Sequence, residues 1–270
     1  MITIKYMIWS EIRPYSWYNY KKRIWIKQVY TEMCGPIIMQ IIRDGFEMTR
    51  FFDVLFSEIA IIILLPFMIP IMIGLKLTGE HDIFYGQERI GKGGKPFKVW
   101  KFATMLRNSP NMAGGLYTEK NDPRILPMGR FLRKTKINEL PQLINILSGD
   151  MSIIGYRPLV EKEFKEYPEE VKRELAKSRP GLSGIGSIVF RNEEEILHKF
   201  PTHEEKDKFY FDYIMPYKGQ LEAWYVEHRN VFMYWKLIGM TVEAVLNPKS
   251  DGWKKIKGLP KTPKELEKVL

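Results

Sequence analysis

The chain contains one long apolar run, the seventeen uncharged residues from Ile59 to Leu75. A helix rises about 1.5 Å per residue, so crossing a bilayer takes about 20 apolar residues. Pro66 and Pro70 interrupt the run, and each proline removes a helical hydrogen bond and clashes with the preceding turn. The pattern therefore predicts a membrane helix that breaks at Pro66 into two arms, each too short to cross.

Basic residues lie on both sides of this run: Arg43 and Arg50 before it, Lys76 after it. Because positive charge is retained on the cytoplasmic side, the pattern favours a re-entrant helix over residues 46–80, with both chain termini in the cytoplasm. Two alternatives remain open, a tilted spanning helix kinked at Pro66 and a core helix of a soluble protein. A cleavable secretory signal is not expected, since the run starts only at residue 59.

The rest of the chain shows shorter patterns. Two strand-like stretches around the sequence KGGK predict a β-hairpin over residues 83–105. Acids and bases at helical spacing predict one solvated helix over 158–177, and two further helices are expected at 204–215 and 217–244, the second amphipathic. The flanking segments are an aromatic and basic extension of unknown role, suited to the headgroup region, and a polar tail: residues 1–45 and 247–270.

Charge is concentrated in one part of the chain. The whole sequence has 42 Lys and Arg against 32 Asp and Glu, a net charge of +10. Residues 86–136 alone contain twelve bases and three acids, or 12 − 3 = +9. Such a surface favours anionic partners, namely phosphate-bearing substrates, an anionic membrane face or nucleic acid. Nucleic acid is not expected, because no recognition helix or aromatic stacking platform is apparent and this partner leaves the apolar run unexplained.

Metal and disulfide chemistry receive little support from the thiols and imidazoles. Cys34 is the only cysteine, and the four histidines do not occur at metal-ligand spacing. A structural zinc site and a disulfide framework are therefore not expected.

The stretch 122–158 combines basic and acidic residues in a pattern suited to phosphate chemistry. Basic side chains lie on or near one predicted helix, and Asn138 is a good N-cap for the next helix, which would place Glu139 in its first turn. A helix start attracts both a carboxylate and a bound phosphate. Ordinary capping explains Asn138 and Glu139 equally well, so spacing alone decides nothing. The basic residues are Arg130, Arg133, Lys134 and Lys136.

Several separate motifs occur in an order that resembles the bacterial sugar transferase family, over about Arg50 to Leu246. They are RFFD (50–53), Pro66 within the apolar run, QERIG (87–91), GKPFKVWKFATM (94–105), DPR (122–124), GRFLRKTKINELPQLINILSGDMS (129–152), GYRP (155–158) and RPGLSG (179–184). The resemblance is to the small form of the monotopic polyprenyl-phosphate phosphoglycosyl transferases.

The resemblance implies an α+β monotopic membrane protein with a re-entrant, proline-broken membrane helix, a short β-hairpin and several amphipathic or interfacial helices. Residues 81–246 would form the cytoplasmic catalytic domain. Such enzymes move a sugar 1-phosphate from a UDP-sugar to undecaprenyl phosphate, release UMP and use Mg2+. They begin a lipid-linked glycan, such as an exopolysaccharide, capsule or O-antigen. The implied location is the cytoplasmic face of the bacterial inner membrane, in contact with its lipid, and a homo-oligomer is possible.

The family's catalytic Asp-Glu pair reads Asn138-Glu139 in this chain. An amide has no anionic oxygen, so Asn138 cannot form an acyl phosphate. Three interpretations follow. Glu139 acts as both nucleophile and Mg2+ ligand with Asn138 orienting it, or Asp150 in the GDMS motif takes one of these roles, or the chain is an inactive relative that binds lipid phosphate or a glycan-assembly partner. The first is favoured because the basic and phosphate-facing motifs are otherwise intact.

The resemblance also implies a set of phosphate-binding cations, since guanidinium and ammonium groups donate several hydrogen bonds to charged oxygens. Lys101 and Arg157 are the principal candidates. The family's Gly-Pro-Arg-Pro is GYRP here, so Tyr156 replaces a proline beside Arg157. The further candidates are Arg124, Arg133, Arg179 and Arg191.

Overall fold

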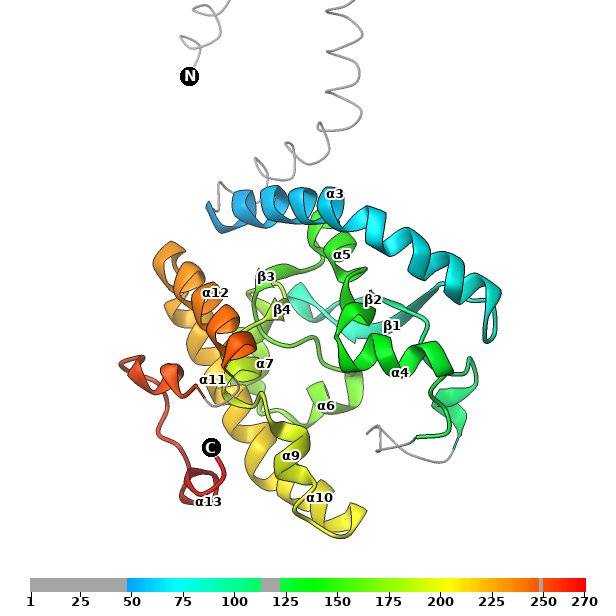
Figure 1. The fold of residues 1–270 in the computed structure, drawn as a ribbon. Coiled ribbons are helices and arrows are strands. Elements are labelled where there is room, and N and C mark those ends of the chain that lie inside the picture. The colour runs from blue at the N-terminus through cyan, green and yellow to red at the C-terminus, as the bar shows by residue number, and fades with distance from the viewer. Residues whose placement is uncertain (1–47, 113–121, 248–249) are drawn as a thin grey trace, which may run out of the picture. The chain divides into compact units, whose positions relative to one another are not determined.

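The computed structural model describes residues 48–112, 122–247 and 250–270, so the predictions for residues 1–45 lie outside the described part. Short helices surround two small sheets beneath one long helix, α3 (Figure 1). The elements are α3 (Met48–Leu77), β1 (Phe84–Ile90), β2 (Pro96–Phe102), α4 (Pro127–Lys134), η5 (Ile137–Glu139), α5 (Gln142–Ser148), β3 (Ser152–Ile154), α6 (Glu161–Glu166), α7 (Glu169–Ala176), β4 (Gly181–Ser183), α8 (Ile185–Val189), α9 (Glu193–Leu197), α10 (His203–Phe209), η6 (Tyr210–Ile214), α11 (Met215–His228), α12 (Val231–Leu246) and α13 (Lys264–Glu267).

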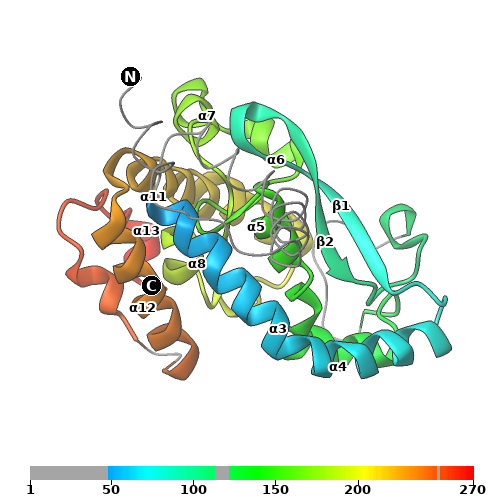
Figure 2. The same ribbon diagram turned by 90° about the horizontal axis from the view of Figure 1, so that it is seen from above.

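Helix α3 contains the apolar run and continues through both of its prolines. It changes direction partway along its length, as seen from two sides in Figures 1 and 2. Interior prolines bend helices because each removes a hydrogen bond and crowds the preceding turn. The structure therefore shows one continuous helix with a bend, and not the two separate arms expected from a break at Pro66. Over its most apolar 18 residues the mean hydropathy is 2.5.

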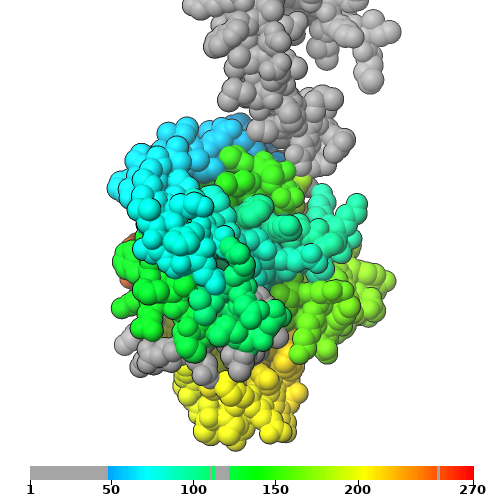
Figure 3. All heavy atoms as spheres, turned by 90° about the vertical axis from the view of Figure 1, so that its right-hand side faces the viewer, coloured from blue at the N-terminus to red at the C-terminus, as the bar shows by residue number. Residues whose placement is uncertain are grey.

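Helix α3 buries polar side chains and exposes apolar ones, the opposite of a helix in the core of a soluble protein. Its buried residues include the polar Arg50, Asp53 and Ser57, whereas Ile62 is 71% and Phe67 67% exposed. Only 17% of the most apolar window is buried. A core helix of a soluble protein would bury these residues, so this exposure argues against that alternative. Figure 3 shows α3 at one end of the described unit and α10, in yellow, at the other.

Hydrogen bonds attach the N-terminal part of α3 to the rest of the protein. The guanidinium of Arg50 donates to the carbonyl oxygens of Ile146 and Leu147, at the C-terminal end of α5. The carboxylate of Asp53 accepts from the Ile153 amide at 2.9 Å and from the Tyr234 hydroxyl at 2.8 Å. Asp53 is 2% exposed, so these partners replace the water that it loses on folding.

The predicted hairpin is confirmed. Strands β1 and β2 pair antiparallel, with Tyr85 opposite Lys101 and Arg89 opposite Phe97. The turn between them includes Gly93 and Gly94 at φ of 73° and 70°, a backbone region that glycine enters without steric cost.

A second, parallel pair of strands brings the GYRP and RPGLSG motifs together. Strands β3 and β4 pair with Ser152 opposite Gly181 and Ile154 opposite Ser183. The backbones approach closely at Gly155, where an added Cβ would lie 2.5 Å from the Arg179 carbonyl oxygen. Only a residue without a side chain fits there.

Two of the predicted helices are each divided in two. The helix expected over 158–177 is α6 and α7, separated before Pro168, which cannot continue a helix as a hydrogen-bond donor. The helix expected over 217–244 ends at His228, and α12 starts afresh with Asn230 as its N-cap, accepting from the Met233 amide at 2.9 Å. In both places a local capping or breaking residue overrides a continuous amphipathic pattern.

The tail is less polar in its packing than in its composition. Trp253, Ile256 and Leu266 are 7%, 5% and 0% exposed, and all three belong to the largest hydrophobic cluster. Sparse apolar residues in this segment of polar composition therefore still contribute to the core.

Replacing Tyr234 by Phe removes the hydroxyl that donates to the buried Asp53 carboxylate. We expect a loss of about 1–3 kcal/mol in the free energy of unfolding, because a buried acceptor loses a partner. Thermal unfolding of the purified protein in detergent measures this loss, because each kcal/mol lowers the melting temperature by about 2–4 °C. Tyr85→Phe, on an exposed tyrosine, serves as the control and should leave the melting temperature unchanged. Equal melting temperatures for all three proteins would contradict the role given to Asp53.

Candidate active site

A cleft with about 350 Å³ of empty space, open to solvent, lies between the hairpin, the start of α5, the GYRP segment and β4. Its lining brings together residues that are far apart in the sequence. Lys101, Glu139 and Arg157, three of the predicted site residues, are among them. The full lining is Arg89, Val99, Lys101, Glu139, Gln142, Arg157, Pro158, Gly181 and Leu182.

A tight turn between α4 and α5 places Glu139 in this cleft. Helix α4 ends at Lys134, and Lys136 follows in the left-handed conformation, with φ of 60°. A short 3-10 turn comes next, in which the Glu139 amide donates to the Lys136 carbonyl at 3.0 Å. Lys136 is exposed, and its amide donates to the Arg133 carbonyl at 3.1 Å, so a local turn at the end of α4 sets the direction of the chain ahead of Glu139.

The predicted N-cap role of Asn138 is wrong. Helix α5 starts at Gln142, preceded by Pro141, and no side chain caps it. Asn138 lies inside the 3-10 turn instead, since the left-handed Lys136 turns the chain before a regular helix can begin. Glu139 is therefore in a turn ahead of the helix and not in its first turn.

Glu139 and Lys101 form the central charge pair of the cleft. The Lys101 ammonium nitrogen lies 4.0 Å from a Glu139 carboxylate oxygen, and their side chains are 23% and 28% exposed. Burial lowers the pKa of Lys101 to about 8, and the negative charge of Glu139 opposes this shift. Arg157 and Arg89 lower the Lys101 pKa further, which shows that the cations of the cleft act on one another. A bound anion would relieve this repulsion.

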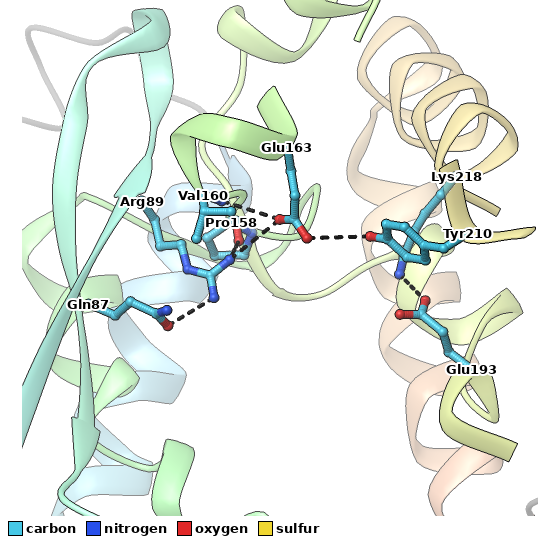
Figure 4. A network of polar contacts seen from close by, with 8 residues as sticks. All are labelled: Gln87, Arg89, Pro158, Val160, Glu163, Glu193, Tyr210 and Lys218. Atoms are coloured by element: carbon cyan, nitrogen blue, oxygen red, sulfur yellow. Dashed lines mark hydrogen bonds and ion pairs between the residues drawn. The ribbon is translucent and has the colours of Figure 1, made fainter. Parts of the chain in front are cut away.

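Arg89 lines the cleft but was not among the predicted site residues. Its guanidinium donates to the Pro158 carbonyl at 3.1 Å and to the Gln87 side chain at 2.8 Å, and it lies 3.7 Å from the Glu163 carboxylate (Figure 4). The alternation of side chains along the hairpin could have identified Arg89 as a site residue. Residues directly opposite each other, and every second residue along a strand, lie on the same face of the sheet. Arg89 therefore lies on the same face as Val99 and Lys101.

Arg157 is the exposed cation at the other side of the cleft. Its backbone amide donates to a carboxylate oxygen of Glu222 at 3.0 Å. Glu222 is 1% exposed, and its second oxygen has no hydrogen-bond partner among the residues that the structure describes. Burial raises the pKa of Glu222 to about 7, against the opposing effects of the Arg157 amide and the Lys218 ammonium. No sequence motif indicated Glu222, because its partner is a backbone group 65 residues away.

The other predicted arginines do not line the cleft. Arg133 lies within electrostatic reach of Glu139, and one of its guanidinium nitrogens is 3.6 Å from the Met105 sulfur. Arg124 is buried and forms an ion pair with Asp122 at 2.6 Å. Phosphate binding by these two side chains stays a prediction.

Arg179 and Arg191 contact backbone carbonyls elsewhere. Arg179 donates to the Gly149 carbonyl at 2.8 Å, and Arg191 donates to the Val245 carbonyl at 3.5 Å. Asp150 lies beyond the C-terminal end of α5, where it accepts from the Ser148 hydroxyl at 2.7 Å. The structure thus places Asp150 and Glu139 at opposite ends of α5.

Magnesium fits the donors of the cleft through Glu139. Within the described residues no group of three or more His, Cys, Asp or Glu side chains could hold a metal ion. Magnesium does not need such a group, because it commonly binds one or two carboxylates together with substrate phosphates and water. In the described part of the chain, Glu139 is the only carboxylate in the lining. Asn138, 5% exposed, adds a neighbouring side-chain oxygen that has no hydrogen-bond partner within the same residues.

A cationic cleft with one carboxylate, next to an exposed apolar helix, suits an enzyme that acts on phosphate esters at a membrane surface. Residues 45–248 match the model of the family described as bacterial sugar transferases. The chain therefore belongs to this family of transferases, as its motifs indicated.

Individual relatives agree with this assignment. The chain is 33% identical over 218 residues to the undecaprenyl-phosphate galactose phosphotransferase of Salmonella typhimurium, a match that covers 76% of this chain and 41% of that protein. It is 34% identical over 212 residues to an uncharacterized sugar transferase of Haemophilus influenzae, covering 73% of this chain and 41% of that protein. It is 38% identical over 170 residues to the exopolysaccharide production protein ExoY of Sinorhizobium fredii, covering 57% and 75%. The chain thus spans less than half the length of the first two relatives.

The charge pair in the cleft predicts how the pKa of Lys101 responds to Glu139→Gln. Because the Glu139 carboxylate raises the Lys101 pKa, its removal should lower that pKa further below about 8. The pH titration of 13C-methylated lysines by NMR measures this value. Glu265→Gln, on α13 and outside the cleft, should leave the Lys101 titration unchanged. A Lys101 pKa that stays the same or rises in Glu139→Gln would contradict the pairing.

Proposed function

We propose that this protein transfers a sugar 1-phosphate from a UDP-sugar to undecaprenyl phosphate, with release of UMP, and so begins a lipid-linked glycan such as an exopolysaccharide, capsule or O-antigen. The observation that carries the proposal is the cleft itself. One carboxylate, Glu139, lies among the cations Arg89, Lys101 and Arg157. A diphosphate requires several cationic donors around a single reacting group, and this arrangement supplies both. The names of the Salmonella and Sinorhizobium relatives agree with the proposed substrate and pathway.

The reaction would proceed in two displacements with Glu139 as the nucleophile. A Glu139 oxygen attacks the β-phosphorus of the UDP-sugar, and the bond to the bridging oxygen breaks, so UMP leaves with that oxygen. An oxygen of undecaprenyl phosphate then attacks the phosphorus held on Glu139, forms the lipid diphosphate sugar and frees the carboxylate. Lys101 and Arg157 stabilise the negative charge on the phosphate oxygens in both steps. Magnesium, held by Glu139 and the substrate phosphates, would neutralise part of that charge.

The site also explains why Asn138 can accompany an active Glu139. The amide is buried in the 3-10 turn, next to the carboxylate in sequence, and its side-chain oxygen has no partner in the described residues. Such an oxygen suits a role in orienting Glu139 or the metal, a role that needs no negative charge. The alternative is an inactive relative that binds lipid phosphate or a glycan-assembly partner, and its motivation is the absence of the family's Asp at position 138.

The packing between α3 and the cleft supports an active site close to a membrane. Met68 and Leu75 of α3 form one hydrophobic cluster with Phe102 and Leu132, and Leu140 packs against it. Phe102 follows Lys101, and Leu140 follows Glu139, so one layer of side chains separates the apolar helix from the catalytic groups. A lipid phosphate at headgroup depth can therefore reach a site on a protein anchored by α3. We propose that α3 is re-entrant, which makes the protein monotopic on the cytoplasmic face.

Glu139→Gln should abolish turnover, with a fall in kcat of about a thousand-fold or more, because the amide is a poor nucleophile. The assay is UMP release by the protein in nanodiscs, given undecaprenyl phosphate and a panel of UDP-sugars. Mass spectrometry of the wild type with UDP-sugar alone should show a phosphosugar adduct that maps to Glu139. Glu170→Gln, on an exposed residue of α7, should behave as the wild type.

Asn138→Asp separates the two candidate functions. An enzyme that uses Glu139 should be active as the wild type, whereas an inactive relative should gain UMP release only when Asp is restored. An adduct on Asp150, or full activity of Glu139→Gln, would contradict the mechanism.

The re-entrant arrangement predicts that both ends of α3 face the cytoplasm. In a Cys34→Ser background, single cysteines at Met48 and at Thr78 should both react with a membrane-impermeant maleimide in inverted inner-membrane vesicles and neither should react in spheroplasts. Both positions are exposed on the protein, so folding does not hide them. Labelling of one position from each side would establish a spanning helix instead.

A further inference from the structure

The backbone on both sides of Arg157 is fixed by hydrogen bonds. On the N-terminal side, the Gly155 amide donates to the Ser183 carbonyl at 2.9 Å and the Tyr156 carbonyl accepts from the Gly181 amide at 2.8 Å. On the C-terminal side, the Leu159 carbonyl accepts from the Ile90 amide at 2.8 Å. The peptide group between Tyr156 and Arg157 thus has its carbonyl oxygen held by the Gly181 amide, and its N–H, the Arg157 amide, is the remaining donor.

Glu222 provides the hydrogen bond at that peptide. Glu222 lies on α11, which is separate in sequence from the strands on either side of Arg157. Its carboxylate accepts from the Arg157 amide at 3.0 Å. The carboxylate has little freedom to move, since an added Cβ on Gly186 of α8 would lie 2.6 Å from the same oxygen. Burial, and after it the charge of Glu222, raises the pKa of the Tyr156 and Tyr167 hydroxyls, which places both rings within electrostatic reach of the carboxylate.

We propose that Glu222 is a positioning residue for Arg157: by accepting the Arg157 amide, it fixes the backbone from which the guanidinium extends into the cleft. The proposal rests on the proposed function, in which Arg157 binds a phosphate group of the substrate. Without a fixed backbone, an exposed arginine varies both in side-chain rotamer and in the direction in which the side chain leaves the chain. Both variations weaken an oriented contact with a phosphate.

The sequence explains why this chain needs such a contact. A proline at position 156, as in the Gly-Pro-Arg-Pro pattern, would restrict the backbone directly through its ring. Tyr156 lacks that restriction, and it is 1% exposed with its ring in the main core. In this chain the core packing of Tyr156 and the Glu222 hydrogen bond to the next amide both act on the backbone ahead of Arg157.

Four variants separate positioning from a general effect on the fold. Glu222→Met keeps the approximate volume and removes the acceptor. Glu222→Gln retains an acceptor oxygen for the Arg157 amide, and its amide nitrogen replaces an oxygen that has no hydrogen-bond partner in the described residues. Leu221→Ala, on a neighbouring residue that is 0% exposed, weakens the same helix without touching Arg157. Glu227→Met, on an exposed residue of α11, is the matched control for the loss of a carboxylate.

The kinetic test is a double-mutant cycle between Glu222 and Arg157, read as UMP release. Glu222→Met should lower kcat/KM roughly ten-fold or more, because a misplaced binding group loses much of its effect. Glu222→Gln should stay within about two-fold of the wild type. In an Arg157→Met background, Glu222→Met should add less than a two-fold change, since the group that it positions is already absent. Leu221→Ala should have the same effect in both backgrounds, and Glu227→Met should have none.

A second measurement does not depend on turnover. In protein labelled with 15N-arginine, the Arg157 backbone amide should exchange slowly with solvent deuterium in the wild type and in Glu222→Gln, and at least about ten-fold faster in Glu222→Met. Rapid exchange in the wild type would overturn the proposal, and so would additive effects in the cycle. If Glu222→Met does not fold, Glu222→Asp, shorter by one methylene, replaces it in both experiments. If the wild type releases no UMP while its Arg157 amide is protected through Glu222, the proposed function fails and the positioning contact stands.

Discussion

The anchoring of α3 by two buried polar side chains is the interaction on which the arrangement of this protein depends. An apolar helix has no reason to prefer a protein surface to lipid, because both offer it the same environment. Arg50 and Asp53 supply that preference through hydrogen bonds to α5, β3 and α12. These groups are satisfied only in one position of the helix, so they determine which side of α3 faces the protein. The apolar side chains then remain outside, available to a bilayer.

The same contacts relate the membrane helix to the chemistry. Arg50 binds the C-terminal end of α5, and Glu139 lies just before its N-terminal end. Helix α5 thus lies between the contacts that attach α3 and the proposed nucleophile. If α3 lies in a membrane, its depth would set the height of the cleft above it, which matters for the proposed reaction between a water-soluble substrate and a lipid one.

Much of the fold could be predicted from the sequence where a pattern is local. The hairpin follows from alternation around glycines with positive φ, and α4 follows from its helical spacing. The cap assigned to Asn138 failed because the left-handed conformation of Lys136, at the end of α4, redirects the chain first. Arg89 could have been found from the hairpin register. Glu222 could not, since its partner is a backbone amide, and backbone groups leave no signature in the sequence.

The apolar residues that follow α12 show that the folded unit extends beyond the part of the chain matched by the family. The match to the family ends at residue 248, yet Trp253, Ile256 and Leu266 complete the hydrophobic interior on which α11 rests. A chain cut at the family boundary would leave that interior open to water on one side, under the helix that carries Glu222. The last twenty or so residues therefore cover one side of the hydrophobic core, although they contribute no residue to the lining of the cleft.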